Sequence, residues 1–175
     1  MKIIGFVGSP RRGKNTQALV ESVLNCAAQN GADVKMYHLA DLNYQGCQSC
    51  YACKKLDNCV LPDDVTPILA EIAQADAIVL GTPIYMWQMT GQLKLFVDRL
   101  YAFYMPALPS KLPPGKKVLL AVSQGNPDEK AFLPYLKNTG DMLKFIGFGS
   151  YEILCVSSPV TTERACAAAK WLTER

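Results

Sequence analysis

The sequence predicts a single α/β domain built on a doubly wound, five-stranded parallel sheet. Three observations predict it. Short, continuous apolar runs recur along the chain, as strands buried on both faces of a parallel sheet do. Segments with helical patterning lie between the runs, which indicates right-handed crossovers within one sheet. Half of the 175 residues are hydrophobic, enough for one core, so we expect a single domain over residues 1–175.

The apolar runs and the segments between them define ten predicted elements. The predicted strands are 2–8, 33–38, 77–81, 117–123 and 151–156. The predicted helices are 16–30, 63–74, 91–104, 129–145 and 161–175. Gly31 is a typical residue after a helix end, and Pro62 with Asp63 is a typical helix start. In the third predicted helix, 91–104, Leu93 and Phe96 fall on one apolar face.

The expected strand order places three loops at one edge of the sheet. Five strands of this kind commonly adopt the flavodoxin-like order 2-1-3-4-5, in which ligands bind at the carboxyl ends of strands 1, 3 and 4. The loops at those ends are 9–15, 82–90 and 123–128. Two irregular stretches remain, 43–62 and the proline-rich 105–115, and loops that long are usually functional or mobile.

The charge distribution and the short apolar runs disfavour nucleic acid and membranes as partners. The formal net charge is +3, and the basic residues occur in separate loops rather than in one stripe, so we expect no nucleic-acid partner. The apolar opening stretch 1–8 is too short for a signal peptide, and no run approaches the roughly 20 apolar residues of a membrane span. We therefore expect a cytoplasmic protein with no membrane partner.

The first loop, G8-S-P-R-R-G-K-N-T16, resembles a nucleotide triphosphate loop only in part. Asn15 stands where that loop needs Ser or Thr to hold magnesium, and neither strand 3 nor strand 4 ends in an acidic residue. What remains is a polar, cationic loop that enters a helix N-terminus, where backbone N–H groups attract an anion. This favours a metal-free monophosphate over an ordinary capped polar loop.

The loop after the third strand is unusually aromatic. It reads T82-P-I-Y-M-W-Q-M-T-G91, and its large side chains could present flat faces and backbone amides to a heteroaromatic ring such as a flavin. The same residues could equally belong to the core or to a subunit interface.

The two loops together resemble a known family. G-S-P-R-x-x-x-N-T after the first strand and P-I-Y-M-W-x-M-T-G-Q-L-K-x-F-x-D-R after the third are similar to motifs of NAD(P)H-dependent FMN reductases and iron-sulfur flavoproteins, which are flavodoxin-like. The resemblance extends to about residue 126. It implies a single FMN-binding domain with a cysteine-rich loop at 43–62.

The resemblance also implies which residues hold the FMN. The phosphate would be bound by the first loop, through Ser9, Arg11, Lys14, Asn15 and Thr16. The isoalloxazine ring would be lined by the second loop, through Pro83, Ile84, Tyr85, Met86 and Trp87. The loop after strand 4 would complete the site, through Ser123, Gly125 and Asn126, with Gln124 between them.

Four of the seven cysteines lie close together in the sequence. The run C47-x-x-C50-x-x-C53-x5-C59 offers four thiolates, and its first three have the spacing of ferredoxin ligands. Val60 after the fourth, where ferredoxins have proline, departs from that pattern. Iron-sulfur flavoproteins carry such a motif in this place, which implies a 4Fe–4S cluster on Cys47, Cys50, Cys53 and Cys59. Structural zinc, a disulfide, a redox dithiol and empty thiols are the alternatives.

The remaining reactive side chains support no other chemistry. His38 is the sole histidine, so no second histidine can share a metal with it, and a hydrolytic triad would need it beside a serine and a carboxylate. We expect it to be a surface or strand-end residue. Cys26, Cys155 and Cys166 lie in apolar surroundings and are expected to be small buried hydrophobes. Asp98 and Arg99 are expected to form an ion pair or a helix face.

We therefore expect an oxidoreductase in which FMN exchanges electrons with the cluster. The expected donor is NAD(P)H or a ferredoxin-like protein, and the acceptor is a small molecule or a protein. A homodimer or homotetramer is implied by the resemblance. Two alternatives remain: an NAD(P)H-dependent FMN, quinone or nitro-compound reductase whose cysteines bind no cluster, and an electron carrier or zinc-stabilised binding module without a substrate.

Overall fold

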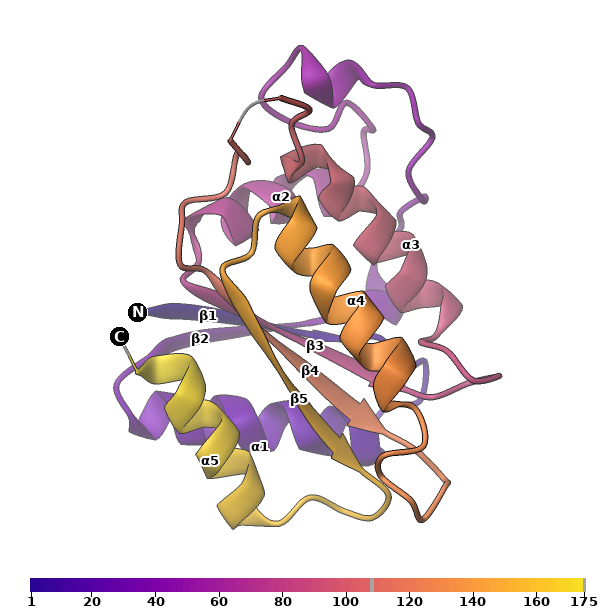
Figure 1. The fold of residues 1–175 in the computed structure, drawn as a ribbon, viewed down its shortest axis with the longest axis vertical. Helices are drawn as coiled ribbons and strands as arrows, with labels where there is room; N and C mark the ends of the chain where they lie inside the picture. The colour runs from indigo at the N-terminus through magenta and orange to yellow at the C-terminus, as the bar shows by residue number, and fades with distance from the viewer. Residues whose placement is uncertain (108, 175) are drawn as a thin grey trace.

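A computed structural model describes residues 1–107 and 109–174, and its centre is one parallel sheet of five strands. The strand order is β2-β1-β3-β4-β5, as predicted (Figure 1). The strands are β1 (Lys2–Val7), β2 (Asp33–His38), β3 (Ala77–Pro83), β4 (Lys117–Ser123) and β5 (Ser150–Val156). The predicted fold class is therefore confirmed.

The apolar runs of the sequence are continuous because the central strands are covered on both faces. Every residue of β3 is buried, whereas the edge strand β2 has no fully buried residue. The pairing of Val7 with Gly81, and of Gly81 with Ala121, aligns the ends of the three central strands at one edge. The loops that follow these strands consequently lie near one another.

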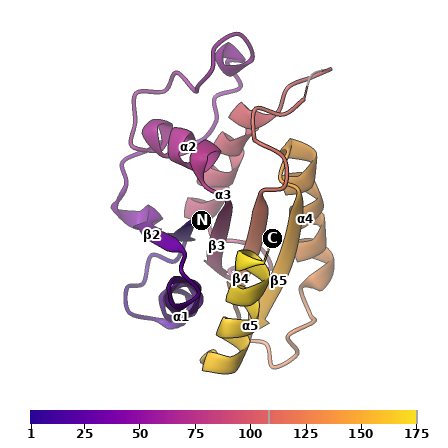
Figure 2. The same ribbon diagram turned by 90° about the vertical axis from the view of Figure 1, so that its left-hand side faces the viewer.

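Two layers of helices cover the sheet (Figures 1 and 2). One face carries α1 (Asn15–Gln29) and α5 (Thr162–Thr173), and the other carries α2 (Val65–Gln74), α3 (Gly91–Arg99) and α4 (Leu133–Ile146). The described residues also form three short 3-10 helices: η1 (Leu39–Asp41), η2 (Ala52–Lys54) and η3 (Leu100–Phe103). Each face of the sheet has its own buried apolar cluster, so the fold has three layers.

Helix α4 begins at Leu133, four positions after its predicted start at 129. The intervening residues form turns instead, in which the side chain of Asp128 accepts a hydrogen bond from the backbone of Lys130. Pro134 then occupies the first turn of the helix, where it is well tolerated. Two predicted positions, Arg175 at the end of the last helix and Leu108 in the stretch 105–115, lie outside the described residues.

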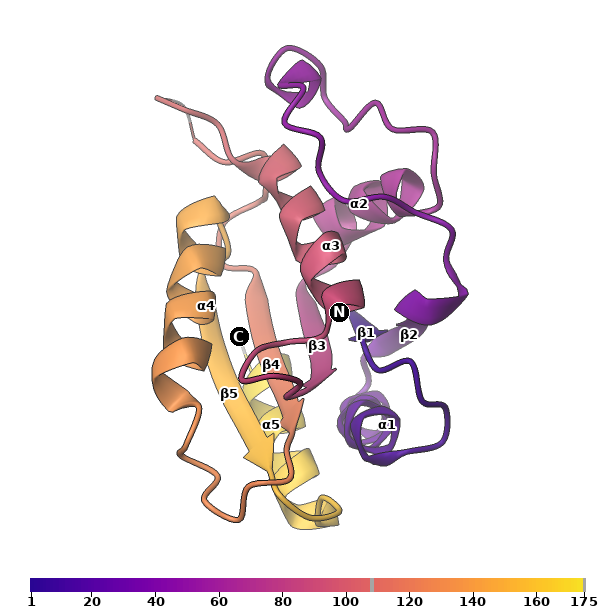
Figure 3. The same cartoon turned by 90° about the vertical axis from the view of Figure 1, so that its right-hand side faces the viewer.

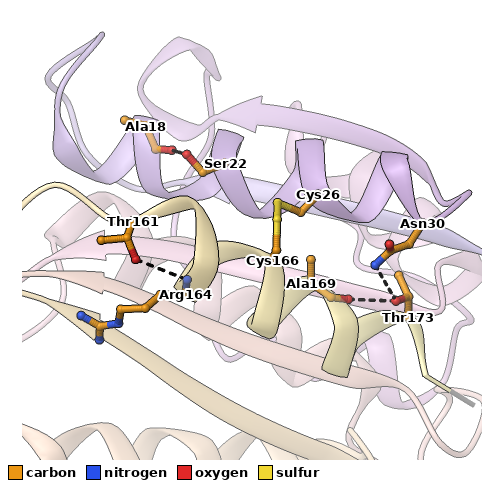
Figure 4. The surroundings of a disulfide bond; sticks show 9 residues. All are labelled: Ala18, Ser22, Cys26, Asn30, Thr161, Arg164, Cys166, Ala169 and Thr173. Carbon is orange, nitrogen blue, oxygen red and sulfur yellow. Dashed lines mark hydrogen bonds between the residues drawn. A yellow bond between two sulfur atoms is a disulfide. The ribbon is translucent and has the colours of Figure 1, made fainter.

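The expectation that Cys26 and Cys166 are unpaired hydrophobes is wrong. Cys26 on α1 and Cys166 on α5 form a disulfide, with Cα atoms 5.1 Å apart (Figure 4). The two helices pack side by side on the same face of the sheet, which brings together residues 140 apart in the sequence. Cys155 remains a free buried thiol, and burial raises its pKa to about 11.

None of the helices among the described residues is both long and apolar enough to span a membrane.

Candidate flavin and cysteine sites

The first loop is fixed to the neighbouring strand and helix at Gly8. The Gly8 N–H donates to the Gly81 carbonyl at 2.8 Å, and the Gly8 carbonyl accepts from Thr90 Oγ1 at 2.7 Å. A Cβ atom at Gly8 would lie 2.8 Å from the Cβ of Leu93, so no larger residue fits without a shift. The close approach of β1 to α3 therefore requires glycine here.

The N-terminus of α1, which follows this loop, has no side-chain cap. Lys14 occupies the N-cap position without a capping hydrogen bond, and the first turn contains no acidic residue. By contrast, α3 and α5 are capped by Thr90 and Thr161. The N–H groups in the first turn of α1 thus keep the positive end of the helix dipole available to an anion.

The predicted phosphate residues surround this N-terminus in two different ways. Arg11, Lys14 and Asn15 are exposed and can reach a ligand. Ser9 is buried, and its hydroxyl accepts a hydrogen bond from the backbone N–H of Arg11 at 3.2 Å. Thr16 is buried too, and its hydroxyl bonds to that of Ser123 at 2.7 Å. The inner polar side chains hold the loop, while the outer ones face solvent.

The second loop forms a tight turn whose tip projects from the protein. Tyr85 and Gln88 exchange two backbone hydrogen bonds, of 2.9 and 3.0 Å. Met86 and Trp87 between them both adopt positive φ angles, 45° and 66°, which are unfavourable for residues with side chains. Their side chains are 83% and 69% exposed, so they do not belong to the core of this chain.

A cavity of about 220 Å³ joins the second loop to the loop after β4. Its lining residues are Ile84, Met86, Trp87, Gln124, Gly125, Asn126 and Phe132. The aromatic and amide groups suit a planar heteroaromatic ring. Phe132, just before α4, was not predicted, because the sequence placed it inside a helix.

Other members of the predicted ring site do not line this cavity. Pro83 is buried as the last residue of β3, and Tyr85 is not among the residues that line the cavity.

Gln124, which does line the cavity, is 8% exposed. Its Nε2 donates to the carbonyls of Asn126 and Asp128, and its Oε1 has no partner among the described residues. That buried acceptor is free for a ligand donor.

The four clustered cysteines line one small cavity of about 20 Å³. Cys47 and Cys50 are exposed, Cys59 is half-buried and Cys53 is buried. Arg99, Tyr101 and Ala102 also line this cavity. Across residues 1–107 and 109–174, no three His, Cys, Asp or Glu side chains are grouped closely enough to hold a metal ion. The chain thus gathers the thiols at one place but does not preset them in ligand geometry.

Two lysines fasten the cysteine segment to the region after α3. Lys111 Nζ donates to the Cys53 carbonyl at 2.7 Å and to the Asp57 carbonyl at 3.2 Å. In the opposite direction, Lys54 Nζ donates to the Tyr101 carbonyl and lies 3.7 Å from the centre of that tyrosine ring. These cations satisfy carbonyls that the irregular backbone leaves unpaired.

The sequence predicts that Asp98 and Arg99 form an ion pair or a helix face. In the structure the two residues do not pair with each other. Arg99 Nη1 lies 2.5 Å from Asp63 Oδ2, while Asp98 pairs with Lys94 at 2.5 Å. Burial alone would raise the pKa of Asp63, but the hydrogen bond and charge of Arg99, together with hydrogen bonds from backbone N–H groups, outweigh it and the pKa is lowered. Asp63 also accepts hydrogen bonds from Val65 and Thr66 N–H groups, so it is a helix start as predicted.

The cysteine segment 43–62 and the loops that follow β3 and β4 lie toward opposite ends of α3 (Figures 1 and 3). The phosphate loop, the second loop and the ring cavity lie at the carboxyl edge of the sheet, where α3 begins. The cysteine segment lies beyond the amino edge, where α3 ends at Arg99. Within one chain, α3 therefore separates the two sites.

The three-layer fold with the strand order 2-1-3-4-5 is a flavodoxin-like α/β architecture. The chain belongs to the NADPH-dependent FMN reductase family, whose sequence model matches residues 1–153.

Two curated relatives are iron-sulfur flavoproteins, and a solved structure of similar fold is a quinone oxidoreductase. An iron-sulfur flavoprotein of Methanocaldococcus jannaschii is 41% identical over 99 residues, which are 57% of this chain and 51% of the relative. An iron-sulfur flavoprotein of Archaeoglobus fulgidus is 29% identical over 132 residues, 75% of this chain and 59% of the relative. The chain thus spans about half the length of the curated relatives it matches. A solved NAD(P)H:quinone oxidoreductase of Methanothermobacter marburgensis shares the fold, with a TM-score of 0.75 at 20% identity over 99% of this chain and 96% of that one.

Proposed function

We propose that this chain binds FMN at the carboxyl edge of its sheet and acts as a flavin-dependent oxidoreductase. The observation that carries the proposal is that the uncapped N-terminus of α1 and the ring cavity beside Trp87 share that edge. A phosphate and a planar ring joined by a ribityl chain need two such features in one place. Membership of the FMN reductase family supports the same cofactor.

We assign the phosphate and the ring to different groups of residues. Arg11, Lys14 and Asn15 would contact the phosphate together with the first N–H groups of α1, because these side chains are exposed at that N-terminus. Ser9, Thr16 and Ser123 would shape the loop through their buried hydroxyls. Ile84, Met86, Trp87, Gly125 and Asn126 would surround the ring, with Pro83 and Tyr85 supporting the turn.

We further propose that Cys47, Cys50, Cys53 and Cys59 ligate a 4Fe–4S cluster. Their four thiols are the donor set such a cluster needs, and they already line one cavity. The names of the relatives support this assignment. When bound, FMN supplies one- or two-electron chemistry and the cluster one-electron chemistry, and this chain's residues position and shield both groups.

A plain reductase is the second candidate function. It is favoured by one observation: the thiols of the described residues form no group close enough to hold a metal ion. In that case the chain would reduce FMN, a quinone or a nitro compound with NAD(P)H, and the cysteines would stay free. NAD(P)H is a donor in both proposals, and a ferredoxin-like partner belongs only to the first.

We propose a homodimer or homotetramer, because the flavin site and the cysteine site of one chain lie apart and a second copy could bring such sites together. An apolar groove of about 350 Å³ lies between α3 and α4, and Phe145 on its rim is 67% exposed. Met86 and Trp87 add exposed apolar surface near the ring cavity. A second copy on this face would cover the flavin ring.

We propose the cytoplasm as the location, because cluster-binding thiols must stay reduced. The four thiols of residues 47–59 are free and support this, whereas the Cys26–Cys166 disulfide is more usual in an oxidising compartment. Cell fractionation with thiol trapping would distinguish a cytoplasmic location from an oxidising compartment.

Iron and sulfide analysis of anaerobically purified protein separates the candidate functions. If the cluster is present, the wild type should contain about four iron and four sulfide per chain, the composition of a 4Fe–4S cluster. Cys59→Ser should lose or convert the cluster while FMN stays bound. Cys155→Ser is the matched control, since that buried thiol lies on β5, away from the cysteine cavity. Absence of iron in the wild type would leave the plain reductase, and one zinc per chain would indicate a structural site.

A further inference from the structure

Arg99, the last residue of α3, lines the cysteine cavity. Its side chain is 0% exposed and is among the largest fully buried side chains of the described residues. A buried guanidinium is unfavourable unless its N–H groups have acceptors. The partners of its five N–H donors therefore show what the chain uses it for.

The two terminal nitrogens of Arg99 are occupied. Nη1 donates to Asp63 Oδ2 at 2.5 Å and to the Gln45 carbonyl at 2.8 Å. Nη2 donates to Asp63 Oδ1 at 3.1 Å and to Thr66 Oγ1 at 2.9 Å. The remaining donor, Nε, is buried and has no hydrogen-bond partner among the described residues. The network around Asp63 fixes the guanidinium and leaves one donor unused.

The unused donor belongs to a residue that lines the cysteine cavity, together with Cys59. Arg99 and Cys59 line the same cavity, whose volume is only about 20 Å³, so the buried Nε–H donor and the thiol belong to one small site. Sulfur ligands accept such hydrogen bonds, and donors to them help set the potential of an iron-sulfur site.

We propose that the Nε–H of Arg99 donates a hydrogen bond to the sulfur of Cys59 when the cluster is bound, which makes Arg99 a positioning residue that raises the reduction potential of the site. The inference rests on the proposed cluster. A donor to a ligand sulfur stabilises the extra negative charge of the reduced form more than it stabilises the oxidised form. Its removal is therefore expected to lower the potential.

The test compares two arginine-to-lysine variants of anaerobically prepared, cluster-loaded protein. Arg99→Lys keeps the charge but removes the fixed Nε–H donor. Arg164→Lys is the matched control, because Arg164 also binds a carboxylate in two-point fashion, at Glu129, and does not line the cysteine cavity. Redox titration should show a more negative cluster potential in Arg99→Lys and no shift in Arg164→Lys, with equal FMN content in both.

A second measurement needs no variant, in case Arg99→Lys does not fold. Electron–nuclear double resonance on the reduced wild type, labelled with 15N-arginine, should detect one guanidinium nitrogen coupled to the cluster. An unchanged potential in folded Arg99→Lys, or no nitrogen coupling in the wild type, overturns the role of Arg99 while the cluster stands. A wild type without iron overturns the cluster itself, and the inference with it.

Discussion

The hydroxyl oxygens of Thr16 and Ser123 lie 2.7 Å apart and form a buried hydrogen bond between the first turn of α1 and the end of β4. Both residues are predicted FMN contacts, and that role stays a prediction. The hydrogen bond joins two of the three loops of the flavin site across 107 residues of sequence. It indicates that the phosphate loop and the ring cavity are held as one unit.

Removal of this hydrogen bond should destabilise the fold in a coupled way. Thr16→Val leaves the buried Ser123 hydroxyl without its partner and should lower the free energy of unfolding by about 1–3 kcal/mol. The double variant Thr16→Val/Ser123→Ala should lose less than the sum of the two single losses, because no unpaired hydroxyl remains. Urea unfolding of the four proteins gives the coupling; strictly additive losses would mean that the hydroxyls do not interact.

The exposed side chains of the phosphate loop should matter only to ligands with a phosphate. Arg11→Ala/Asn15→Ala should weaken FMN binding about 10- to 100-fold, as expected when charge-assisted hydrogen bonds are lost, and leave riboflavin binding unchanged. Lys170→Ala, an exposed cation on α5, is the control. Fluorescence titration measures each affinity. Equal weakening of FMN and riboflavin would remove the phosphate role.

Trp87 should affect the flavin far more than the fold. Because its side chain is 69% exposed, Trp87→Ala should change the free energy of unfolding by less than about 0.5 kcal/mol while shifting the flavin absorbance. Phe96→Ala is the contrast, since Phe96 is fully buried and its loss should cost about 3–5 kcal/mol. If Trp87→Ala unfolds like Phe96→Ala and the flavin spectrum stays the same, Trp87 acts in packing instead.

The Cys26–Cys166 disulfide should be a large contributor to stability. It closes a loop across a sequence separation of 140, for which the chain-entropy model gives about 5 kcal/mol. Dithiothreitol should therefore lower the urea midpoint of the wild type clearly and should not change that of Cys26→Ala/Cys166→Ala. A wild type with the same midpoint with and without reductant would show that the disulfide is absent or contributes nothing.

The fold could be predicted because the central strands carry a direct signal. Strands β1, β3 and β4 are buried on both faces, and that burial appears in the sequence as uninterrupted apolar runs. The start of α4 was misplaced because it depends on hydrogen bonds of Asp128 and on a turn, which periodicity does not record. Local side-chain competition with the helix decided that boundary.

The site was predictable only where its residues are consecutive. The loops containing Ser9 and Trp87 carry motifs, so the sequence located them at the carboxyl edge. Arg99 has its partner Asp63 36 residues away, and Cys26 has its partner 140 residues away. Such pairs arise from the packing of distant segments, and a single sequence contains no pattern that records them.

FMN binding to the purified chain tests the central claim most directly. Isothermal titration of ligand-free protein with FMN should reach saturation at one FMN per chain, and ATP with magnesium should not compete, because the loop has no metal-binding hydroxyl at Asn15. Saturable one-to-one binding that ATP leaves untouched is the predicted result. No binding of FMN, or its displacement by ATP with magnesium at micromolar concentrations, would contradict a flavin site at this edge of the sheet.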